Sequence, residues 1–482
     1  MGLNHLAIVL LSLLAIAMLA GPVFAVDPPA PRKIVPSPGQ LKWQALEIIS
    51  IFHYGPNTYV GQEWGYGDTP AKVFHPDKLD TDQWVEVCKS AGIKGAILVA
   101  KHHDGFCLWP SKYTEYSVKS SPWKNGKGDL VGDLAESCKQ GGLKFGIYLS
   151  PWDRNHADYA SPAYVEYYYK QWVEVLSNHG AIFEIWFDGA NGGTGYYGGA
   201  REKRSISKDY YNYPRILALL KDKHPHAIAF NYPGPQSSRW PGNESGDAGK
   251  TNWCEIGSKG LPGGGYWSPA EADTPAIGKW FWTPRRKVDS LETLVNKYFT
   301  SVGRGGVLNF GLAPDKSGLI DAKDAARLKQ FGDYIRAMRK TDLARGKQAV
   351  ATQTRGGTKA TTFAACNVLD GDATTYWTTD DGVTRADIEV DFGGDVTFNV
   401  VSASEFIKLG QRIKSCTVEA FQAGKWRQVA KGTTVGYKRM FRIPDTKASR
   451  IRIRILDSFE CPMLGSLNVY RTPRIAAGIA SH

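Results

Sequence analysis

The sequence lacks several features that would place it in common classes of protein. Beyond the first 25 residues, no apolar run approaches the roughly 20 residues that a membrane-spanning helix needs. The seven cysteines include no CxxC pair, which argues against a zinc cluster. There is no arginine-rich arm and no nucleic-acid motif, although the net charge is +12. We therefore expect no membrane span, no metal centre and no nucleic-acid partner.

The first 25 residues are typical of a secretory signal peptide. An apolar run from Leu6 to Leu19 follows a short front end, and Val23-Phe24-Ala25 precedes the expected cleavage point before Val26. The alternative, a membrane anchor, would need a longer apolar run. We expect an exported protein, extracellular or periplasmic in a Gram-negative bacterium. An odd number of cysteines then leaves at least one thiol unpaired. We expect Cys88 and Cys138 to be buried helix residues rather than a disulfide bridge.

Short apolar runs alternate with amphipathic segments from about residue 45 to residue 340. Alternating strands and helices at this spacing form a parallel sheet, and about eight units over some 300 residues predict a (β/α)₈ barrel of the TIM type. Strands are expected at 45–52, 95–100, 145–149, 181–187, 227–231, 279–283 and 307–310, and helices at 81–91, 129–140, 164–178, 209–223, 290–301 and 319–339.

The pattern changes after about residue 350. Runs such as Ala386–Phe392 and Arg450–Ile455 alternate apolar and polar residues and are separated by turns, which predicts a β-sandwich. Its early segment, from Asn367 to Trp377, resembles the opening of discoidin-like, galactose-binding-type modules. Ser466 stands where these modules usually carry an acid that helps hold calcium. The predicted organisation is a signal peptide (1–25), a barrel (26–345) and a sandwich (346–476).

Polar residues follow the apolar strands of the predicted barrel, where catalytic groups gather in this fold. One interpretation is a metal site built from the His-His-Asp run at 102–104, but adjacent strand residues point in opposite directions and no third histidine has metal-like spacing. The other is a sugar pocket in which Trp64 packs on the sugar and two carboxylates do the chemistry. The glycine pattern at 193–198 follows a strand but opens no convincing helix, so we do not expect a dinucleotide site. The strand-end residues are His53, His102, His103, Asp104, Tyr148, Asp153, Asp188 and Asn231.

Five motifs stand out along the predicted barrel: His53-Tyr-Gly-Pro-Asn-Thr-Tyr59, Glu63-Trp-Gly65, Lys101-His-His-Asp-Gly-Phe-Cys-Leu-Trp-Pro-Ser111, Tyr148-Leu-Ser-Pro-Trp-Asp153 and Trp186-Phe-Asp-Gly189. Together they resemble one family, the retaining α-L-fucosidases of glycoside hydrolase family 29. The resemblance spans residues 36–344. It implies that Asp188 is the nucleophile and that His53, Glu63, Trp64, His102, His103 and Tyr148 surround the fucose, with no cofactor.

The segment from Ser238 to Gly246 resembles the branch of this family that acts on α-1,3/1,4 linkages at N-acetylglucosamine. In that branch the glutamate of this segment is the acid/base, so the resemblance implies that role for Glu244. Pro241 and Ser245 depart from the expected pattern. Glu271 is the alternative acid/base, and its structural interpretation is an ion pair with Arg285 or Arg286. Four further substrate-binding candidates are Arg239, Trp240, Trp280 and Trp282.

The expected function is therefore hydrolysis of α-1,3/1,4-linked L-fucose from fucosylated oligosaccharides or glycoproteins. The alternatives are a fucosidase with α-1,2 or α-1,6 preference and a carbohydrate-binding protein with weak catalysis.

Overall fold

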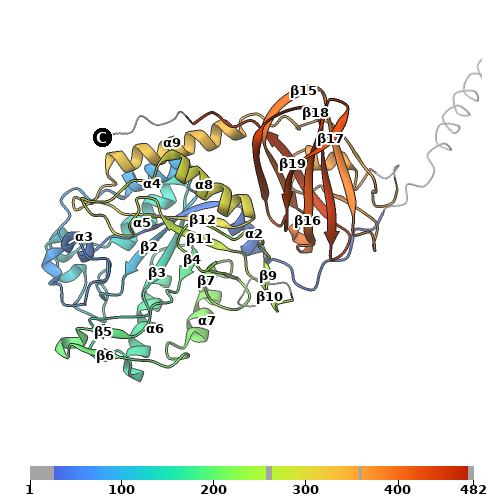
Figure 1. Cartoon of the computed structure of the whole chain (residues 1–482). Coiled ribbons are helices and arrows are strands. Elements are labelled where there is room, and N and C mark those ends of the chain that lie inside the picture. The colour runs from blue at the N-terminus through green and yellow to red at the C-terminus, as the bar shows by residue number, and fades with distance from the viewer. Residues whose placement is uncertain (1–25, 257–262, 358–360, 476–482) are drawn as a thin grey trace, which may run out of the picture.

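The computed structural model describes residues 26–256, 263–357 and 361–475, which form two domains side by side (Figure 1). The predicted signal peptide lies outside these residues. Among the helices of the described part, none is both long and apolar enough to cross a bilayer. The predicted α/β barrel and C-terminal sandwich are both confirmed.

The first domain is a barrel of parallel strands. Their hydrogen-bonded order is β11-β12-β1-β2-β3-β4-β7-β8. The ring closes where the N–H of Arg239 donates to the carbonyl of Pro269 and the N–H of Glu271 donates to the carbonyl of Arg239, both at 2.9 Å. The strands are β1 (Ile48–Phe52), β2 (Gly95–Lys101), β3 (Lys144–Leu149), β4 (Ile182–Trp186), β7 (Ile228–Phe230), β8 (Ser237–Ser238), β11 (Glu271–Pro275) and β12 (Val307–Leu312).

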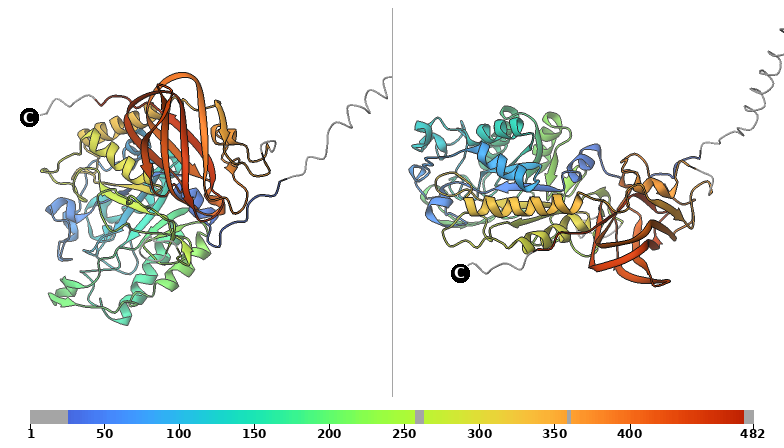
Figure 2. Two further views of the ribbon diagram at one scale, coloured as in Figure 1. Left: turned by 45° about the vertical axis from the view of Figure 1, so that its right-hand side comes forward. Right: turned by 90° about the horizontal axis from the view of Figure 1, so that it is seen from above.

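Helices cover the outside of the barrel, and α9 runs toward the second domain (Figures 1 and 2). Local chemistry sets their ends: the Asp80 carboxylate accepts the N–H groups of Asp82 and Gln83 at the start of α4, and Gly92 ends that helix at φ 79°. The helices are α2 (Pro38–Gln44), α3 (Pro56–Val60), α4 (Thr81–Ala91), α5 (Leu130–Gly141), α6 (Pro162–Asn178), α7 (Tyr213–Lys223), α8 (Leu291–Ser301) and α9 (Ala322–Arg339). Cys88 and Cys138 are buried free thiols on α4 and α5, as expected.

One predicted strand of the barrel is wrong. Residues 279–281 form a bend and residues 282–283 are irregular, and the strand of this unit is β11, which begins eight residues earlier. The two-residue spacing of Trp280 and Trp282 matches the alternation typical of a strand, which led to the wrong prediction. The observed strand has the polar sequence Glu271-Ala-Asp-Thr-Pro275, and its acids face the barrel interior, so no apolar pattern marked it. The glycine pattern at 193–198 opens an antiparallel pair, β5 (Gly193–Gly195) with β6 (Glu202–Arg204). Another short pair joins β9 (Glu255–Ile256) to β10 (Tyr266–Trp267).

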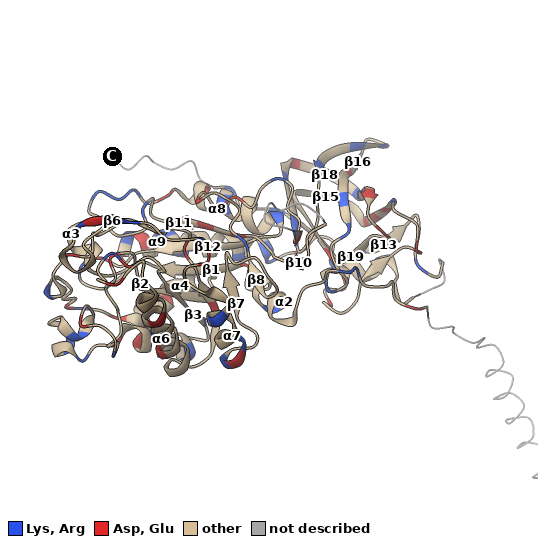
Figure 3. Ribbon diagram, turned by 90° about the horizontal axis from the view of Figure 1, so that it is seen from below, with Lys and Arg blue, Asp and Glu red and all other residues tan. Residues whose placement is uncertain are grey.

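The second domain is a seven-stranded antiparallel sheet folded around its own core. Ile388 pairs with Ile453 and Val390 with Ile451, and all four side chains are fully buried. The arginines that alternate with these isoleucines lie on the outer face in ion pairs with acids of neighbouring strands. The strands are β13 (Gln348–Ala351), β14 (Trp377–Thr378), β15 (Ala386–Glu405), β16 (Ile413–Gln422), β17 (Lys425–Gly432), β18 (Arg439–Ser458) and β19 (Met463–Tyr470). Figure 3 shows basic and acidic residues interspersed over both domains.

Candidate active site

Four neighbouring strands bring the predicted polar residues together at the carboxyl end of the barrel. His53 follows β1, His102 follows β2, Tyr148 lies in β3 and Asp188 stands two residues beyond β4. The ring centroids of His53 and His102 are 5.8 Å apart, and those of His102 and Tyr148 are 6.1 Å apart. Parallel strands end on the same face, which is why residues so distant in sequence meet here.

Asp188 is held by two donors. Its Oδ2 accepts the Tyr148 hydroxyl at 2.9 Å, and its Oδ1 accepts the backbone N–H of Ala190 at 2.6 Å. The Nε2 atom of His103 lies 4.0 Å from Oδ2, and the Asp188 side chain keeps 26% of its surface exposed. A carboxylate with a fixed orientation and an open face is suited to attack a bound substrate.

The histidines around Asp188 are neutral at ordinary pH. Burial, with a smaller contribution from neighbouring His103, lowers the pKa of His53 to about 3. Burial also lowers the pKa of His102 well below its usual value. The pKa of His103 falls for the same reason, although Asp188 opposes the shift.

The tautomer of His103 follows from its hydrogen bonds. Its Nδ1 lies 2.7 Å from the Ser150 hydroxyl, which itself donates to the carbonyl of Trp152. The hydroxyl must therefore accept the proton on Nδ1, and Nε2 is left as an acceptor on the side of Asp188. A substrate hydroxyl can donate to this nitrogen.

Tryptophans form the walls of the site. Half of the Trp64 surface is exposed, and its ring lies 5.1 Å from His103 and 5.8 Å from Trp152 between centroids. Trp280 packs on His53 at 4.9 Å. Exposed aromatic faces beside polar side chains suit a sugar, whose C–H groups pack on the ring while its hydroxyls are hydrogen-bonded.

Glu244 reaches the same site from the loop after β8. Its Oε2 accepts the indole N–H of Trp280 at 3.0 Å, which connects it through Trp280 to His53. Burial raises the pKa of Glu63, Lys279 opposes this shift, and the charge of Glu244 adds to it. Glu63, Glu244 and Lys279 therefore share the rim of the site.

The other candidates divide between the rim and the scaffold. Trp240 is 41% exposed and donates its indole N–H to Asp273 at 2.9 Å. Arg239 belongs to the bridge that closes the barrel, and its guanidinium donates to the side chain of Asn252. Trp282 lies under the guanidinium of Arg286.

Glu271 lies inside the barrel, at the first residue of β11, and is fully buried. Its carboxylate accepts from the Trp186 indole at 2.8 Å, the Asn309 amide at 2.8 Å and the Ser238 hydroxyl at 3.0 Å. The expected ion pair with Arg285 or Arg286 is wrong, since Arg286 binds Asp324 and Asp321.

The sequence interpretation missed Asp273, the next inward-facing residue on β11. It is buried beneath Trp240, and burial raises its pKa well above the usual value, with the charges of Glu271 and Glu244 adding to the effect. Its two-residue spacing from Glu271 was the available signal, but it could be recognised only once the strand was placed.

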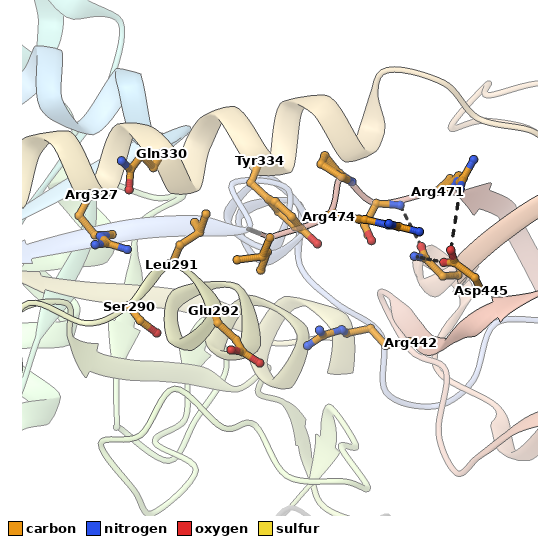
Figure 4. A pocket seen from close by; sticks show the side chains of 14 residues that line it. Ser290, Leu291, Glu292, Arg327, Gln330, Tyr334, Arg442, Asp445, Arg471 and Arg474 are labelled. Atoms are coloured by element: carbon orange, nitrogen blue, oxygen red, sulfur yellow. Dashed lines mark hydrogen bonds and ion pairs between the residues drawn. The ribbon is translucent and has the colours of Figure 1, made fainter. Parts of the chain in front are cut away.

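In the described part of the chain, the site is not a metal centre, and a cavity between the two domains lies apart from it. Within residues 26–256, 263–357 and 361–475, no group of three or more His, Cys, Asp or Glu is arranged to hold a metal ion. A cavity of about 730 Å³ lies between α8, α9 and the sandwich and is lined by Tyr334, Arg442 and Arg471 among others (Figure 4). None of the residues that line it belongs to the predicted site.

Comparison with known proteins gives consistent matches. The family model for alpha-L-fucosidase matches residues 40–340, and the F5/8 type C domain model matches residues 348–463. Alpha-L-fucosidase 1 of Arabidopsis thaliana is 36% identical over 460 residues, which cover 92% of this chain and 88% of the plant protein. A glycoside hydrolase 29 family member from an unknown rumen bacterium has a crystal structure that is 38% identical with a TM-score of 0.82, covering 94% of this chain and 80% of that one. A Ruminococcus gnavus GH29 fucosidase in complex with fucose is 31% identical with a TM-score of 0.85, covering 94% and 98%.

Proposed function

This chain belongs to the α-L-fucosidases of glycoside hydrolase family 29, and from that premise we propose that it is a retaining enzyme that removes α-1,3/1,4-linked L-fucose from Lewis-type glycans. The observation that carries the proposal is the presence of two carboxylates beside the same group of aromatic and histidine side chains at one end of the barrel. Asp188 is fixed by Tyr148 on one side, and Glu244 is fixed by Trp280 on the loop after β8.

In the proposed mechanism the two carboxylates act in turn. Asp188 attacks the anomeric carbon while Glu244 protonates the departing oxygen, which gives a fucosyl-enzyme ester. Glu244 then removes a proton from water as the water attacks the ester and releases fucose with its original configuration.

The neutral histidines and Trp64 serve recognition in this proposal. Buried neutral imidazoles bind sugar hydroxyls without placing a positive charge beside the nucleophile, and the exposed face of Trp64 packs on the C–H side of the ring. The fucose complex of the Ruminococcus gnavus relative supports fucose as the sugar.

The proposed linkage depends on the loop that carries Glu244. Its sequence from Ser238 to Gly246 resembles the α-1,3/1,4 branch. Trp240 within this loop and Trp280 beside it lie where the leaving-group sugar would bind. Product analysis with Lewis a, Lewis x and 2'-fucosyllactose tests this part. We expect release of fucose from the two Lewis trisaccharides and little from 2'-fucosyllactose. Preferential cleavage of 2'-fucosyllactose would assign the α-1,2 specificity, and release from none of them would favour a binding protein.

We also propose that the protein is exported and that its mature chain begins at Val26. Intact-mass measurement of the protein from its native source tests this, and a mass that retains residues 1–25 would contradict export by cleavage.

A further inference from the structure

The loop that carries Glu244 runs from Arg239 to Asn252, and several contacts join it to the barrel. The N–H groups of Gly246 and Ala248 donate to the carbonyls of Asp273 and Thr300, at 3.2 and 3.0 Å. Glu244 itself is exposed. A general acid must hold its proton within hydrogen-bond distance of the leaving oxygen, so contacts that fix the ends of this loop influence where the acid lies.

Three residues of the sandwich supply these contacts, and we call Gln411, Thr433 and Thr434 the clamp. The Gln411 amide donates to the carbonyl of Asn252 at 3.0 Å and accepts the N–H of Cys254 at 2.9 Å. The Thr434 hydroxyl accepts the N–H of Asn252 at 3.0 Å, and the Thr433 hydroxyl donates to the carbonyl of Lys250 at 2.9 Å. The side chain of Gln411 is fully buried, so these bonds are shielded from water.

Asn252 joins the clamp to both sides of the loop. Its side-chain oxygen accepts from the guanidinium of Arg239, the residue before the loop begins. Its side-chain N–H donates to the carbonyl of Arg304 at 2.8 Å. Arg304 in turn pairs with Asp247, whose carbonyl accepts from Asn243, the neighbour of Glu244, at 2.9 Å.

Hydrogen bonds within the sandwich fix the position of the clamp residues independently of the loop. Buried Glu405 accepts the N–H groups of Arg412, Ile413 and Gly436 at 2.6, 3.0 and 2.7 Å, which fixes the two turns that carry Gln411 and Thr434. A Cβ atom on Gly436 would lie 3.0 Å from the Gln411 amide, and its φ of 61° favours glycine. Glycine at position 436 therefore leaves room for the Gln411 side chain.

We propose that the sandwich is a positioning element for acid/base catalysis and that Gln411 is its principal positioning residue. The proposal rests on the proposed role of Glu244. It gives the sandwich a positioning role in the reaction, because the clamp sets where the loop leaves the barrel and hence where Glu244 can hold its proton.

Leaving-group dependence in the full-length enzyme tests this proposal. A Lewis-type trisaccharide needs protonation as its bond breaks, whereas a 2,4-dinitrophenyl fucoside does not, and positioned general acids contribute about 10²–10⁴-fold to rate. The Gln411→Leu variant keeps the volume but removes both hydrogen bonds. We expect the ratio of kcat/KM for the trisaccharide to that for the dinitrophenyl fucoside to fall by at least about tenfold. An equal loss on both substrates, or no loss, would overturn the proposal.

Three further variants make the result specific. Thr434→Val removes a single clamp bond and should lower the same ratio by a smaller factor, at least about threefold, and an unchanged ratio would count against the clamp even if Gln411→Leu failed to fold. Arg442→Ala breaks a contact with Asn296 elsewhere in the interface and should leave the ratio unchanged. Glu244→Ala should lower the ratio most. If it does not, the acid/base assignment fails; if it does while the clamp variants do not, only the positioning role fails.

Discussion

At the scale of single residues, the site depends on how Asp188 is oriented. Two donors fix its carboxylate, and the acceptor nitrogen of His103 lies 4.0 Å away, where it can accept a sugar hydroxyl beside the nucleophile. The sequence pattern placed Asp188 at a strand end but did not identify which side chain holds its carboxylate. Tyr148 was predicted as a neighbour of the sugar, and its direct bond to the carboxylate is visible only in the structure.

The Tyr148→Phe variant tests this orientation. It removes one hydrogen bond to a charged group, which is worth about 1.5–3 kcal/mol. We expect kcat/KM to fall by about 10–100-fold with little change in Tm. The matched control is Tyr168→Phe, because that buried hydroxyl donates to the carbonyl of Leu149 on the same strand and does not touch the site. Equal losses in the two variants would show that the effect is structural.

At the scale of elements, the sequence pattern predicted the strands that are apolar on both faces and missed the strands that carry polar residues. β1 to β4 were placed within a few residues of their ends because each is an apolar run between a helix and a polar strand end. β8 and β11 escaped because Ser238, Glu271 and Asp273 give them a polar sequence. The Ser238 hydroxyl donates to Glu271 where these two strands meet, and the pattern within one sequence segment does not reveal such a pair.

The same limit applies to the choice between two glutamates. The sequence left Glu244 and Glu271 as alternative acid/base residues, because the distance of each from the sugar depends on how the loops fold over the end of the barrel. The structure places Glu244 against Trp280 on the rim and Glu271 in the interior. The proposed assignment therefore follows from element geometry, which the spacing along the chain does not contain.

The Trp280→Phe variant tests the contact between this loop and the site wall. Phenylalanine can keep the packing on His53 but has no N–H to donate to Glu244. We expect kcat/KM for a Lewis trisaccharide to fall by about 3–10-fold, while that for a dinitrophenyl fucoside stays within about twofold. A larger loss on the dinitrophenyl substrate would mean that Trp280 mainly binds fucose.

At the scale of the whole molecule, charges buried between the domains join the barrel to the sandwich. Glu47, just before β1, pairs with Arg339 of α9 at 2.6 Å and with Lys438 of the sandwich. Burial alone would raise the pKa of Glu47, but the charges of Lys438 and Arg339 and their hydrogen bonds outweigh it and lower the pKa to about 2. Ionised Glu47 is therefore one of the contacts that join the two domains.

Acid should weaken this connection in a defined range of pH. Because the pKa of Glu47 is lower in the folded protein, its stabilising effect is complete above its unfolded value near 4.5 and is lost as the pH falls toward 2. The Glu47→Gln variant should be less stable at pH 7 by on the order of 3 kcal/mol, and the difference from wild type should shrink at pH 3. Thermal unfolding at the two pH values measures this. The exposed Glu136→Gln variant is the control, and a Tm difference for Glu47→Gln that did not change with pH would contradict the assignment.

The most direct test of the account is chemical capture of the intermediate. A 2-deoxy-2-fluoro-fucosyl fluoride should form the ester with the nucleophile and then hydrolyse slowly, because the fluorine destabilises the oxocarbenium-like transition state. Peptide mass spectrometry after labelling should place one fluorofucosyl group on Asp188, and the Asp188→Ala variant should remain unlabelled. A label on any other carboxylate, or turnover without a covalent intermediate, would contradict the central claim.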